Sequence, residues 1–205
     1  MPNFPIRWTC SAFFFISGFC GLLYQVVWMR LAFARFGINT PVLSIVLSVF
    51  MAGLALGSWL GGRLSRSWGK KDGALALSCY GACEWLTGFG AFLVPHLFAL
   101  GGLLLLPLGG VDSGLYLCAS AAVLLFSLLP WCFFMGTTFP FMTAYLKGVY
   151  GSEEGFSFLY TANVLGAMAG VLMTAVVLVE CLGFHGTLLL GAGLNSLVGL
   201  LAFWL

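Results

Sequence analysis

The sequence has 205 residues, of which 61% are hydrophobic and only 7% are charged. A water-soluble domain carries about 25% charged residues because its surface must be solvated, so this composition excludes a soluble globular protein and indicates lipid as the main solvent. The net charge of +2 is too small, and the charges too scattered, to indicate a nucleic-acid partner.

Six apolar stretches are each long enough to cross a bilayer, which takes about 20 helical residues. We therefore predict an all-α integral membrane protein, a bundle of six transmembrane helices that forms a single membrane domain over 1–205. Polar or glycine-rich segments separate the stretches, and the last separator runs from Gly183 to Gly186. The predicted helices cover 8–32, 41–63, 73–95, 115–146, 156–180 and 186–205.

Two parts of the chain depart from this simple pattern. The segment 97–108 is apolar but too short to cross a bilayer, so we expect a re-entrant or interfacial segment there rather than a seventh helix. The fourth helix contains Pro130 and Pro140. Both prolines predict a kink, because proline cannot donate the backbone hydrogen bond of a helix.

Basic residues are distributed unequally between the two sides of the predicted bundle. Six helices leave only Arg30 and Arg35 on one side. Because basic loops stay in the cytoplasm, this bias predicts that both termini are cytoplasmic. Most of the basic charge on that side comes from the loop after the second helix, with Arg63, Arg66, Lys70 and Lys71, and the rest from Arg7 and Lys147.

Glycines recur every four residues in two predicted helices. Gly53, Gly57 and Gly61 form a stripe on the second helix, and Gly166 and Gly170 form one on the fifth. Small residues let helix backbones approach closely in lipid. The stripes therefore predict close helix contacts, either within the chain or at an oligomer interface.

Polar side chains inside a membrane are costly and by default indicate function. Glu84 lies near the middle of the third helix, where it could bind a proton or a cation, or serve as a hydrogen-bonded core residue. Arg30 and Glu180 fall at a similar depth, where an ion pair between them is geometrically possible and would act as a structural clamp. The candidate intramembrane polar site consists of Glu84, Gln25, Arg30, Glu180 and Asn163.

We find no pattern that indicates catalysis, a cofactor or a metal ion. No Ser/His/Asp set or phosphate-binding loop is recognisable. The cysteines lie in or next to apolar runs, where cysteine is usually a small hydrophobic residue. We therefore expect no catalytic residue, no cofactor and no metal site, and no enzymatic activity from this chain alone.

Three stretches carry a resemblance to a known family. They are the run SGFCGLLYQVVWMR from Ser17 to Arg30, the run AGLALGSWLGGR over 52–63, and the pair MGTTFP over 135–140 with YTANVLGA over 160–167. Together they resemble the N-terminal membrane domain of bacterial fused transporter/spermidine synthase-like proteins. The basic loop after the second helix is also similar to the corresponding loop of major facilitator transporters.

This resemblance implies half of a major facilitator-like fold in the inner membrane of a bacterium. The related fusions continue into a soluble synthase-like domain that carries the residues for aminopropyl transfer. This sequence contains no such domain, so no catalytic residue is carried over. The resemblance also suggests polyamines as a class of solute.

Two functions remain open on these observations. The first, which the sparse intramembrane polar groups favour, is a non-catalytic membrane module that anchors or stabilises a partner enzyme or a membrane complex. The alternative is a half-size transporter or binding protein for a small cationic, polyamine-like solute, working as a dimer. The expected partners are the lipid bilayer, a second copy or another membrane or cytoplasmic subunit, and a small amine.

Overall fold

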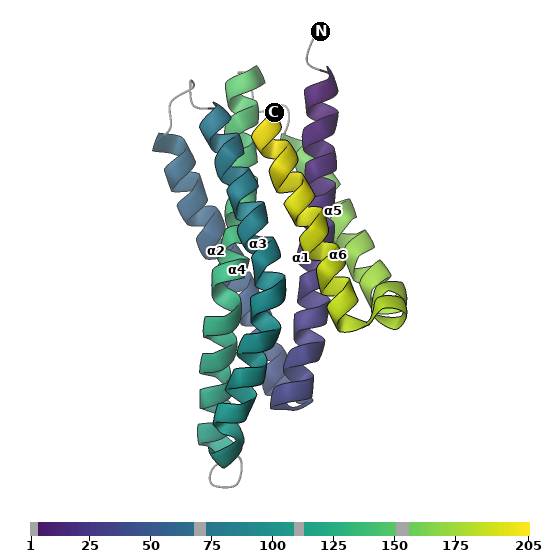
Figure 1. Cartoon of the computed structure of the whole chain (residues 1–205). Helices are drawn as coiled ribbons and strands as arrows, with labels where there is room; N and C mark the ends of the chain where they lie inside the picture. Colours follow the sequence, from purple (N-terminus) through teal and green to yellow (C-terminus); the bar gives the residue numbers. More distant parts are fainter. Residues whose placement is uncertain (1–3, 68–72, 109–112, 151–155) are drawn as a thin grey trace.

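A computed structural model describes residues 4–67, 73–108, 113–150 and 156–205, and within these ranges the chain is almost entirely helical and contains no strand. Figure 1 shows the helices as one elongated bundle. The elements are α1 (Phe4–Phe36), α2 (Thr40–Ser67), α3 (Gly73–Leu105), the 3-10 turn η1 (Leu106–Leu108), α4 (Ser113–Tyr150), α5 (Phe156–Met173), the π-helical η2 (Thr174–Leu178) and α6 (Val179–Trp204).

Within the described residues, five helical stretches are long and apolar enough to cross a membrane. Large apolar side chains are exposed along them, including Trp59, Phe89, Leu104 and Leu172. Lipid solvates such a surface and water does not. The structure therefore agrees with the predicted class, an all-α multi-pass membrane protein.

The longest of these stretches is Phe156–Trp204, with 49 residues. It is interrupted at Gly183, whose backbone has φ of 66° and ψ of 179° inside the region assigned to α6. Glycine adopts this left-handed φ without the steric cost that a Cβ atom imposes. Figure 1 shows that the chain reverses direction there, so that α5 and α6 run antiparallel.

The structure differs from the prediction of a separate re-entrant or interfacial segment over 97–108. Residues 97–105 continue α3 beyond Pro95, and only the last three form the turn η1. One proline removes a single backbone donor, which a long apolar helix tolerates. Gly101 does not break the helix either: it packs against Val123 of α4, whose side chain a Cβ atom would overlap.

The glycine stripe of α2 faces α4 of the same chain. A Cβ atom added to Gly57 would overlap the carbonyl oxygen of Phe133, and one added to Gly53 would overlap Cys132. The approach is reciprocal, because a Cβ atom on Gly136 would overlap the backbone of Leu54. The stripe therefore serves helix packing within the chain.

Ser58 completes this contact between α2 and α4. α4 continues through Pro140, which has no N–H to donate to the carbonyl of Gly136 four residues earlier. The hydroxyl of Ser58 donates a hydrogen bond to this carbonyl oxygen at 3.0 Å. The hydroxyl therefore takes the place of the backbone donor that the proline lacks.

The glycine stripe of α5 faces α1. Cβ atoms on Gly166 and Gly170 would overlap the carbonyl oxygens of Phe15 and Phe19. α1 also contacts α6 and α3, and α3 in turn packs on α4 and α6. α5 has no comparably close contact with α2 or α4. The two closely packed pairs are therefore α2 with α4 and α1 with α5, with few close backbone contacts between α5 and the other pair.

Candidate functional site

Glu84 is buried in the middle of the bundle, with only 1% of its surface exposed. It lies on α3, and its main contact comes from α1, where the hydroxyl of Ser17 donates a hydrogen bond to Oε1 at 2.6 Å. Tyr80, one helical turn before Glu84, approaches the carboxyl group. Its buried hydroxyl does not reach hydrogen-bond geometry with any described residue.

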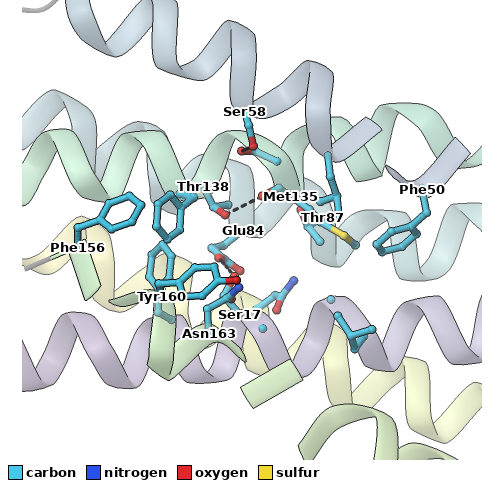
Figure 2. Close-up of a pocket in the computed structure, with 18 residues that line it drawn as sticks. Ser17, Phe50, Ser58, Glu84, Thr87, Met135, Thr138, Phe156, Tyr160 and Asn163 are labelled. Carbon is cyan, nitrogen blue, oxygen red and sulfur yellow. Dashed lines mark hydrogen bonds between the residues drawn. The ribbon is translucent and has the colours of Figure 1, made fainter. Parts of the chain in front are cut away.

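Glu84 faces a cavity of about 330 Å³. The cavity lies between the pair α2–α4 and the pair α1–α5, and all six of the labelled α-helices contribute to its wall. Figure 2 shows Glu84 at the centre of the labelled residues, with Phe156 toward one end and Phe50 toward the other. This volume lies at the small end of the range typical of pockets that bind small molecules.

Close helix approaches bring the polar groups of this wall together. Gly18 of α1 lies directly against Asn163 of α5, because a Cβ atom there would overlap the asparagine. Gly88 of α3 lies against Ala192 of α6, at 3.4 Å from its Cβ position to the carbonyl oxygen. Asn195, one turn along α6, thereby reaches the same cavity as Glu84.

Two buried polar side chains in the wall each have an oxygen atom without a hydrogen-bond partner among the described residues. Thr87 lies one turn after Glu84 and is 3% exposed, and Asn195 is 1% exposed. Both line the cavity, and neither the Thr87 Oγ1 nor the Asn195 Oδ1 has a partner. An unpaired polar atom in an apolar interior is costly. The cavity therefore offers unpaired hydrogen-bonding groups to an occupant.

Aromatic side chains form the other part of the wall. Phe139 of α4 contacts Phe14 of α1, with ring centroids 5.5 Å apart, and Phe156 of α5, with centroids 5.1 Å apart. Tyr160 lies one turn after Phe156 on the same wall, and Phe50 lies at the opposite end. The wall thus combines polar groups from all six α-helices with apolar, largely aromatic side chains.

The structure brings together two of the five residues of the predicted polar site. Glu84 and Asn163 both line the cavity. Gln25 is buried in α1 but is not among the lining residues. The ion pair that is geometrically possible from the sequence is not formed: no salt bridge joins Arg30 to Glu180, and the Glu180 side chain is exposed.

Sequence reasoning did not identify Ser17, Ser58, Thr87 or Thr138 as site residues. Single serines and threonines occur throughout membrane helices, so residue type alone does not mark them. One signal was available, since Thr87 follows Glu84 at a spacing that places both on the same helix face. Ser17 could be found only by knowing that α1 packs on α3.

The predicted basic loop is described in part. Arg63 and Arg66 are exposed at the end of α2, where the guanidinium carbon of Arg63 lies 4.7 Å from the centroid of the Trp59 ring. The Nε atom of Arg66 donates to the carbonyl of Gly62 at 2.9 Å. Lys70 and Lys71 lie outside the described residues.

The site and the fold together define a multi-pass helical membrane protein with a partly polar cavity inside its bundle. The described residues contain no cluster of three or more His, Cys, Asp or Glu side chains that could hold a metal ion. No protein-family model, curated protein or solved structure matches this chain.

Proposed function

We propose that this protein binds a small cation inside the membrane, at the cavity that Glu84 faces, as a half-size transporter or binding protein. The observation that carries the proposal is the carboxyl group of Glu84, buried beside an open volume. Among the described residues that line the cavity, none is basic. A carboxylate inside a membrane needs a counter-charge, and a cation in the cavity would supply it.

The proposal includes a membrane arrangement with six crossings. The reversal at Gly183 divides the longest apolar stretch into two arms, which supports six crossings. The first turn of α1 and the last turn of α6 lie at the same end of the bundle (Figure 1). Exposed basic side chains gather at that end, and we assign it to the cytoplasm of a bacterial cell. They are Arg7, Arg63, Arg66 and Lys147.

The proposed binding is tested with the substitution Glu84→Gln, which keeps the size and hydrogen-bonding capacity of the side chain but removes its charge. The purified full chain is reconstituted in proteoliposomes, and uptake of radiolabelled methylammonium, putrescine and spermidine is measured. We expect at least one of them to enter, and its uptake to fall by about tenfold or more, since a hydrogen bond to a charged group contributes about 1.5–3 kcal/mol.

Glu180→Gln is the matched control. It removes an equal charge from an exposed side chain outside the cavity, so uptake should stay at the wild-type level. Uptake that is equal in the wild type, Glu84→Gln and empty liposomes would contradict the proposal.

A second candidate function is that of a membrane anchor for a cytoplasmic or membrane-bound partner. The observation that favours it is the exposed basic end of the bundle described above, which would attract an acidic surface. Mild-detergent purification from native membranes tests this candidate. A stoichiometric second subunit that dissociates at high salt would support anchoring, whereas a chain that purifies alone would count against it.

A further inference from the structure

We infer that the cation bound by the Glu84 cavity is a monoammonium ion with an apolar, preferably aromatic, body, rather than a polyamine. The inference rests on the proposed function and names the class of its ligand. It is carried by the placement of hydrogen-bond donors, of charge and of aromatic rings around the cavity.

The first argument concerns hydrogen-bond donors. Three hydroxyl groups of the wall have already used their single hydrogen: Ser17 donates to Glu84, Ser58 to the carbonyl of Gly136, and Thr138 to the carbonyl of Met135. The Thr138 bond, at 2.7 Å, is drawn in Figure 2. A hydroxyl that donates its hydrogen keeps lone pairs that can only accept. These three groups can therefore only accept from a ligand, which suits a ligand that donates.

An ammonium group is such a ligand, because it carries up to three N–H donors and no acceptor. Placed beside Glu84, it can donate to the carboxylate and also to the unpartnered oxygens of Thr87 and Asn195. It would thereby balance the charge of Glu84 and give hydrogen bonds to two buried oxygens that otherwise have no partner. A neutral alcohol could satisfy these groups but would leave the charge unbalanced.

The second argument concerns the number of charges. Glu84 is the one acidic side chain among the described residues that line the cavity. A diamine or triamine would bring a further ammonium group into a wall of rings and aliphatic side chains, where an unpaired charge is strongly disfavoured. These apolar residues are Phe14, Leu22, Phe50, Leu54, Met135, Phe139 and Phe156. The wall thus matches one positive charge.

The third argument concerns the shape of the apolar part. The ring of Phe139 meets the rings of Phe14 and Phe156, each in an edge-to-face contact. Aromatic rings prefer such offset or edge-to-face contacts, which add about 0.5–1.5 kcal/mol to the burial of their area. A ligand ring next to Phe139 would extend this cluster. The same rings also stabilise a nearby cation through their faces.

The test is isothermal titration calorimetry of the purified full chain in lipid nanodiscs, with empty nanodiscs as the blank. The probes are phenethylamine, putrescine and 2-phenylethanol, which replaces the ammonium group with a hydroxyl. We expect phenethylamine to bind about tenfold or more tightly than either of the others. In Glu84→Gln, phenethylamine should no longer bind more tightly than 2-phenylethanol.

A second pair of variants tests whether the cavity recognises an aromatic body. It also distinguishes a loss of this contact from a general loss of folding. Phe139→Leu should weaken the binding of phenethylamine by about 3- to 10-fold and the binding of butylamine much less. Phe126 also lies on α4 but is 75% exposed and outside the cavity, so Phe126→Leu should leave the affinities for both amines unchanged. If Phe139→Leu lowered the affinities for phenethylamine and butylamine equally, the assignment of an aromatic body to the ligand would be overturned.

The outcomes separate this inference from the function on which it rests. Glu84-dependent binding of putrescine that is as tight as that of phenethylamine would overturn the inference and leave the cation site in place. Binding of no amine, or binding that Glu84→Gln does not change, would overturn both.

Discussion

At the scale of single residues, the hydrogen bond from Ser17 to Glu84 is the contact that joins α1 to the buried carboxyl group. The presence of Glu84 in an apolar helix was enough to predict it as a candidate, because a carboxyl group in such a run is expensive. Its donor could not be predicted. A serine in a membrane helix commonly bonds to its own backbone, and only the packing of the two helices shows that this one does not.

We predict that Ser17→Ala lowers the free energy of unfolding by about 1–3 kcal/mol, the cost of leaving a buried polar group without its partner. The measurement is unfolding by sodium dodecyl sulfate in mixed micelles. Ser11→Ala is the control in the same helix, because the buried Ser11 hydroxyl has no hydrogen-bond partner among the described residues. Equal destabilisation by the two substitutions would show that the bond contributes nothing measurable.

At the scale of elements, glycines let the backbone of α2 approach α4 closely and the backbone of α5 approach α1 closely. The spacing of four residues between the glycines predicted such contacts, but not which helix each stripe would contact. The error over 97–108 has a related cause. The segment was judged by its own length, which is too short to cross a bilayer, whereas in the structure it extends α3, and Gly101 makes room for Val123.

We predict that Gly57→Ala destabilises the protein by about 1–3 kcal/mol, because its Cβ atom would overlap the carbonyl oxygen of Phe133 and force α2 and α4 apart. Gly62→Ala is the matched control, since no atom lies within 4 Å of its Cβ position. That substitution should be neutral or slightly stabilising, because alanine favours the helix over glycine. The measurement compares detergent unfolding curves of the two variants. A free energy of unfolding that Gly57→Ala leaves unchanged would refute the close contact.

At the scale of the whole molecule, composition alone predicted a multi-pass helical membrane protein, because apolar length is the dominant signal for spanning helices. The cavity could not be predicted in this way. It lies where the backbone of α5 has few close contacts with α2 and α4, and this depends on the directions of whole helices. The sequence pattern indicates which residues face a neighbour, and says little about a gap between neighbours.

We predict that both ends of the chain lie in the cytoplasm. Green fluorescent protein fused after Leu205 should be fluorescent, and alkaline phosphatase at the same point should be inactive, because it folds only outside the cytoplasm. Alkaline phosphatase fused after Gly37, at the opposite end of the bundle, should be active. Active phosphatase at Leu205 would show an odd number of crossings or the reverse orientation.

The turn at Gly183 has a consequence for how the protein is made. One residue with a positive φ separates the arm that contains α5 from the rest of α6, so the two arms share almost no connecting loop. We expect the ribosome-bound insertion machinery to receive them together and to release them into lipid as a single hairpin. A bulkier residue in place of the glycine would then act during biosynthesis, as a failure of insertion, before the folded bundle exists.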